Sequence, residues 1–137
     1  MNANELMLGN YVKETATNRI GTILYVDFDK AKVKLEHSTL FCPIQAIEPI
    51  PLTEKWLLDL GFNKDYKFGY IGIDFKSGNM TTDFVLTYPL KNGDFQKYFI
   101  WEHSSFKYNE LQYVHELQNL FFILTNNHLQ LVGQTNG

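Results

Sequence analysis

Residues 49–62 read PIPLTEKWLLDLGF, and this stretch divides the chain into two differently patterned parts. Thr53 can cap a helix, because its hydroxyl can accept a backbone N–H of the first turn. Gly61 can adopt the left-handed conformation that ends a helix. We therefore predict a short helix that links an N-terminal part, residues 1–50, to a C-terminal part, residues 51–132.

The part before this helix has the pattern of a small β-barrel. Five short strands with tight connections are expected, at Tyr11–Lys13, Ile20–Phe28, Ala31–Leu35, Thr39–Cys42 and Ile44–Ile47. In the third of them, lysines alternate with apolar residues, which is the period of a strand with one buried face. So many short strands within the first 50 residues, opened by LGNYV, predict an SH3-like barrel.

The part after the helix has the pattern of an antiparallel β-meander covered by a second helix, so the fold class is α+β. Three strands are expected, at Tyr66–Phe75, Met80–Tyr88 and Phe95–Trp101, with a bulge at Tyr70–Ile71 and turns at Ser77–Asn79 and Asn92–Gly93. A helix over 111–125 carries an apolar stripe at helical spacing, and Asn126–Asn127 ends it. A short strand at His128–Val132 and a frayed tail at 133–137 complete the prediction.

Composition places the chain among globular proteins of the reducing cytoplasm. The apolar content is 45%, the net charge is −3, and Cys42 is the single cysteine, so no disulfide forms within the chain. The N-terminus lacks the pattern of a signal peptide, and the apolar run at 120–124 is far shorter than the ~20 residues of a membrane span. We expect no membrane association.

Motifs that carry chemistry are incomplete. His115 and Glu116 begin a zinc-protease motif, but its second histidine would stand where this chain has Asn119. Cys42 precedes Pro43 in an apolar strand, where a buried, inert thiol is usual. Because the sequence also lacks a nucleophile elbow and a glycine-rich phosphate loop, we expect no metal and no cofactor. An unrecognised enzyme is the second alternative.

Lysines on the third strand offer one candidate surface. Lys30, Lys32 and Lys34 would place three charges on one face of the barrel, where nucleic-acid phosphates could bind. However, the first 50 residues hold five basic and six acidic residues, and no ladder of exposed aromatic residues is evident beside the lysines. A solvated face is favoured over a nucleic-acid site.

The outer stripe of the C-terminal helix offers a second candidate surface. It consists of Gln112, His115, Glu116 and Asn119, with Phe122 as the next position along it. A charge-poor stripe that ends in a large apolar ring is typical of a protein interface. The competing interpretation is that another layer of the chain covers Phe122.

Three motifs, ELMLGNYV, IEPIPLTEKWLLDLGF and YVHELQNLFFILT, closely resemble those of an uncharacterised family of short Bacteroidetes proteins often encoded in phage-derived or mobile regions. The resemblance implies a cytoplasmic accessory protein and supplies no catalytic residue, substrate or cofactor. The chain departs from the family at Asn126, Asn127 and His128, where the family tends to have a glycine and acidic residues.

Together these observations favour a non-enzymatic protein that binds an unknown protein partner. Nucleic-acid binding is the alternative, and homo-oligomerisation stays open.

Overall fold

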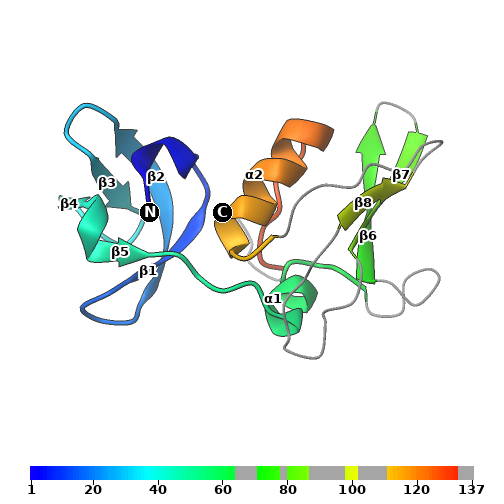
Figure 1. Cartoon of the computed structure of the whole chain (residues 1–137), viewed down its shortest axis with the longest axis horizontal. Coiled ribbons are helices and arrows are strands. Elements are labelled where there is room, and N and C mark those ends of the chain that lie inside the picture. The colour runs from blue at the N-terminus through cyan, green and yellow to red at the C-terminus, as the bar shows by residue number, and fades with distance from the viewer. Residues whose placement is uncertain (64–70, 78–79, 87–97, 102–110, 133–137) are drawn as a thin grey trace. The chain divides into compact units, whose positions relative to one another are not determined.

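The computed structural model describes residues 1–63, 71–77, 80–86, 98–101 and 111–132, and within them the fold is α+β (Figure 1). The chain divides into two compact units. Unit 1 comprises Met1–Pro51 and Tyr113–Leu120, and unit 2 comprises Leu52–Gln112 and Phe121–Gly137. The last helix, α2 (Val114–Thr125), therefore contributes its first half to unit 1 and its second half to unit 2.

Unit 1 is built on a five-stranded antiparallel sheet in the order β4-β3-β2-β1-β5. Its elements are η1 (Ala3–Glu5), β1 (Tyr11–Glu14), β2 (Ile20–Asp27), β3 (Lys32–Leu35), β4 (Phe41–Pro43), η2 (Ile44–Ala46) and β5 (Ile47–Glu48). The two ends of this order, β4 and β5, do not pair with each other in the described chain. The sheet is thus open, and closure into the expected SH3-like barrel is not confirmed.

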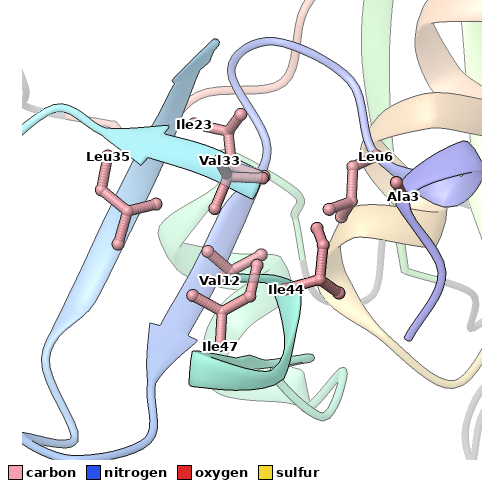
Figure 2. Packing of buried hydrophobic residues seen from close by; sticks show 8 residues of the cluster. All are labelled: Ala3, Leu6, Val12, Ile23, Val33, Leu35, Ile44 and Ile47. Carbon is pink, nitrogen blue, oxygen red and sulfur yellow. The ribbon is translucent and has the colours of Figure 1, made fainter. Parts of the chain in front are cut away.

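Alternation along the strands builds the core of unit 1. Figure 2 shows the buried cluster, which consists of Ala3, Leu6, Val12, Ile23, Val33, Leu35, Ile44 and Ile47. Val33 and Leu35 are fully buried, whereas the lysine that precedes each of them is not, as the period of two requires. One face of β3 therefore belongs to the core, and the opposite face points away from it.

The connection from β4 to β5 differs from the expected strand at Ile44–Ile47. Residues Ile44–Ala46 form the 3-10 turn η2, and only Ile47–Glu48 continue as a strand. The turn forms because the Ile47 N–H donates to the Ile44 carbonyl, while the Ile44 N–H donates to the Ala31 carbonyl at 3.0 Å. This turn carries the buried Ile44 side chain into the core.

The linking helix of unit 2 forms as its end signals predict. Helix α1 spans Glu54–Asp59, and the Thr53 hydroxyl accepts the Trp56 N–H at 3.2 Å. At the other end Gly61 has a φ of +98°, and the Phe62 N–H donates to the Leu57 carbonyl at 2.9 Å. These bonds are those of a glycine-terminated helix, which explains the short length.

A three-stranded antiparallel sheet follows α1 in unit 2. Its order is β6-β7-β8, with β6 at Ile71–Ser77, β7 at Met80–Leu86 and β8 at Tyr98–Trp101, as expected of a meander. The ring of Phe84 packs edge-on against Phe62 and Phe121, with centroids 6.2 and 5.1 Å apart. The predicted bulge at Tyr70–Ile71, both predicted turns and the tail at 133–137 fall wholly or partly outside the described residues.

The chain on either side of α2 departs from prediction. The helix begins at Val114 and not at Leu111, because Tyr113 is bridged to Pro51 and the Val114 N–H donates to the Ile50 carbonyl at 2.9 Å. The expected strand at His128–Val132 is wrong, since these described residues hold no strand. Instead the Val132 N–H donates to the carbonyl of Asp59 at 2.8 Å. Within the described ranges, neither helix has the length and apolarity needed to cross a bilayer.

Candidate binding surface

Three side chains form a row across the outer face of β2, β3 and β4, and we call them the aromatic row. Tyr25 pairs with Lys34, and Lys34 pairs with Phe41. Residues opposite each other in an antiparallel sheet project to the same face. The next pairs along, Val26 with Val33 and Val33 with Cys42, pack on the core side. The row therefore points away from the core.

The two rings of the aromatic row are largely exposed to solvent. Tyr25 is 58% exposed and Phe41 is 49% exposed, and Lys34 between them is half-buried. The Lys34 ammonium lies over the Tyr25 ring, 5.7 Å from its centroid, in a cation–π contact. Single exposed apolar residues are ordinary, but two rings flanking a cation on one sheet face form a defined surface.

A β-bulge in β2 creates this surface. The register shifts between Ile23, which pairs with Leu35, and Tyr25, which pairs with Lys34. The extra residue, Leu24, lets Ile23 stay buried while Leu24 and Tyr25 are both exposed. Simple alternation from Ile23 would have turned Tyr25 towards the core. The bulge thus reverses the phase of the strand and exposes the ring.

Few charges surround the row. Beside it, Lys32 pairs with Asp27 on one side and with Pro43 on the other. The charged residues that project outward from these three strands are thus Asp27, Lys32 and Lys34, which gives the face a net charge of +1. Apolar exposure continues nearby in the sequence, since Leu40 is 75% exposed and Phe28 is 59% exposed.

The structure changes the predicted lysine face at one position. Lys32 and Lys34 lie in β3 and project outward, but Lys30 lies in the turn before the strand. Ala31, at the end of that turn, has a φ of +52° and breaks the alternation. Lys30 instead donates its backbone N–H to the Asp27 carboxylate at 3.0 Å. Two lysines, and not three, share the face, and two rings join them.

The structure departs further from the prediction for the stripe on the C-terminal helix. Gln112 is exposed and precedes α2, but His115 is only 1% exposed. Asn119 is engaged inside unit 1, because its Oδ1 accepts from Asn10 Nδ2 at 2.7 Å and its Nδ2 donates to the Glu5 carbonyl at 2.6 Å. The stripe from His115 to Asn119 thus faces the N-terminal segment and is not an open surface.

Phe122, the last member of the stripe, lies in unit 2. Its ring stacks on the ring of His128, with centroids 4.5 Å apart and planes inclined by 21°. The side chain is half-buried. A local stacking partner therefore accounts for Phe122, and the stripe does not form one continuous interface.

Gln118, a residue that no sequence motif marks, joins α2 to the segment LGNYV. Its Oε1 accepts the Tyr11 N–H at 2.9 Å, and its Nε2 donates to the Gly9 carbonyl at 3.0 Å. Gly9 has a φ of +90°, which explains why glycine stands there. The segment LGNYV and the helix sequence around Gln118 therefore meet inside unit 1.

Two ionisable side chains of unit 1, His115 and Cys42, have pKa values that burial shifts. Burial lowers the pKa of His115, although Glu116 and Glu5 act in the opposite direction. Neither ring nitrogen has a hydrogen-bond partner among the residues that the structure describes. The Glu5 carboxylate lies 3.7 Å from His115 Nε2. Burial also raises the pKa of the Cys42 thiol, which disfavours a thiolate nucleophile.

No group of three or more histidine, cysteine or acidic residues in the described ranges is placed to hold a metal ion. Comparisons of the chain with protein-family models, with curated proteins and with solved structures give no match.

Proposed function

We propose that this chain is a non-enzymatic binding protein and that the aromatic row of Tyr25, Lys34 and Phe41 is its contact surface. The observation that carries the proposal is the exposure of both rings on a face that the sheet holds in fixed register. Side chains on strands keep their spacing before a ligand arrives, so less conformational entropy is lost on binding than with a mobile loop.

The scaffold supports the same proposal. The strand order β4-β3-β2-β1-β5 and the 3-10 turn between β4 and β5 support an SH3-like barrel. We propose an SH3-like barrel because a curled five-stranded sheet can bury one face as a core while its outer face accepts a ligand. The exposed β4, which contributes Phe41, lies at the edge of the sheet.

The proposal is tested by photo-crosslinking in the cells that produce the protein. A diazirine-bearing amino acid replaces Tyr25 in one variant and Phe41 in another, and a third variant carries it in place of Leu8. Leu8 is a matched control, since it is 58% exposed in unit 1 but lies outside the sheet.

We expect adducts from positions 25 and 41 and not from position 8. The diazirine reacts with proteins and nucleic acids alike, so the readout does not assume the class of partner. An adduct with a second copy of the chain would also support the surface. Equal adduct yields at positions 8, 25 and 41, or no adduct at 25 and 41, would contradict the proposal.

A further inference from the structure

We infer that the ligand of the aromatic row is a single-stranded nucleic acid, with bases stacked on Tyr25 and Phe41 and a phosphate at Lys34. This inference rests on the proposed function, because it names the class of partner for the same surface. It joins the lysines of the sheet to the two rings that only the folded chain brings beside them.

The spacing of the row suits an extended, unpaired strand. Neighbouring β-strands lie about 4.8 Å apart, so Tyr25 and Phe41, on either side of β3, are separated by about twice that distance. Lys34 stands between them. A single strand presents bases and phosphates in turn along its length, so it can place bases on the rings and a phosphate at the ammonium. Stacking of this kind tolerates any base, because every base has a π-face.

The charge of the row distinguishes a nucleic acid from a protein partner. The centres of protein–protein interfaces are depleted of lysine, yet Lys34 lies at the centre of this row. The outward charges of the three strands sum to +1, whereas the whole chain carries −3. This face is thus more positive than the chain as a whole, and it carries two rings that can stack on bases; positive charge and stacking surfaces together are features of single-strand sites.

Paired nucleic acid fits this surface less well. A duplex hides the faces of its bases, so the exposed rings would have nothing to stack on. The chain has one arginine, Arg19, and it lies in the turn before β2, outside the aromatic row. Bidentate reading of base edges in a groove depends heavily on arginine. We therefore expect weak sequence preference and a strong preference for single strands.

Fluorescence anisotropy of a labelled oligothymidylate of about 12 nucleotides, titrated with the full chain at low salt, tests the inference. Tyr25→Leu and Phe41→Leu keep apolar bulk but remove the ring, and each is expected to weaken binding by roughly 5-fold to 150-fold. Tyr25→Phe and Phe41→Tyr keep the ring and should bind like the wild type. Far-ultraviolet circular dichroism of all variants shows whether they fold alike.

The salt dependence tests Lys34 separately. Loss of one phosphate contact to a single strand should reduce the slope of log K against log salt by about 0.7. Lys34→Ala should show this change. Lys55→Ala is the matched control, because the Lys55 side chain is 82% exposed on α1 in the other unit and its loss changes the net charge equally.

Absence of binding at low salt would overturn the inference, as would leucine variants that bind like the wild type or equal affinity for a duplex of the same length. These failures are distinguishable from failure of the proposed function. Crosslinks from positions 25 and 41 to a protein would then support the aromatic row as a binding surface and rule out a nucleic acid as its ligand.

Discussion

Replacement of Gln118 by leucine tests how helix α2 is attached to the N-terminal segment of unit 1. The Gln118 side chain is 6% exposed and bonds two backbone groups, accepting from the Tyr11 N–H at 2.9 Å and donating to the Gly9 carbonyl at 3.0 Å. Leucine has a similar size, so Gln118→Leu removes both hydrogen bonds without leaving a large cavity.

The cost of the substitution follows from the two backbone groups that lose these bonds. A buried donor or acceptor that loses its partner costs about 1–3 kcal/mol, so two such groups cost about 2–6 kcal/mol. Burial of the leucine side chain returns about 1.5–3 kcal/mol. We therefore expect the free energy of unfolding to fall by about 0.5–3 kcal/mol, which is a sizeable share of the ~5–15 kcal/mol of a small domain.

Urea denaturation followed by far-ultraviolet circular dichroism measures this change. The control is Gln45→Leu, an exposed glutamine of η2 in the same unit, for which a change within about 0.5 kcal/mol is expected. If the two variants unfold at the same urea concentration with the same slope, the Gln118 bonds contribute nothing and the account of the attachment is wrong.

Two further predictions concern the histidines of unit 1. Because burial lowers the pKa of His115, the native state binds fewer protons than the unfolded state below pH ~6.5. Stability should therefore fall as pH decreases through that value, by at most about 1.4 kcal/mol per pH unit from this group. Urea titrations at several pH values measure this slope, and His115→Gln should reduce it. In Gly21→Ala the new Cβ would lie 2.7 Å from His37 Cε1, so a loss of about 1–3 kcal/mol is expected, and a loss as large in a His37→Ala background would contradict the clash.

Local signals predicted the elements that depend on local bonds. The cap at Thr53 and the left-handed Gly61 set the ends of α1, and both are present. Asn126, with a φ of +58°, ends α2 as its tolerance of that conformation predicts. The alternation in Lys32–Leu35 gave the correct buried face of β3. In each case the deciding residues are within a few positions of one another.

Errors arose where distant parts of the chain decide the structure. The start of α2 is delayed because Tyr113 is bridged to Pro51, a partner 62 positions earlier. The stripe carrying His115 and Asn119 looked polar and therefore exposed, but its amide and imidazole face Glu5 and Asn10. Helical periodicity identifies a polar stripe without indicating that a second segment covers it.

The aromatic row was missed for the same kind of reason. The sequence shows lysines in β3 but not the rings beside them, because Tyr25 and Phe41 come from strands on either side. The bulge at Leu24 also inverts the alternation of β2, so a period of two assigned to the whole strand places Tyr25 on the wrong face. The pairing register of β2, β3 and β4 brings the aromatic row together, and this register cannot be read from the sequence.

The contact between α2 and the N-terminal segment affects how the protein folds while the ribosome synthesises it. Gln118, which bonds to both Gly9 and Tyr11, is synthesised more than 100 residues after them. Synthesis proceeds from the N-terminus at about 5–20 residues per second. Several seconds therefore pass between the synthesis of Tyr11 and that of Gln118. A chain stopped after α1 would emerge with that docking site unfilled, and we expect it to be a substrate for chaperones.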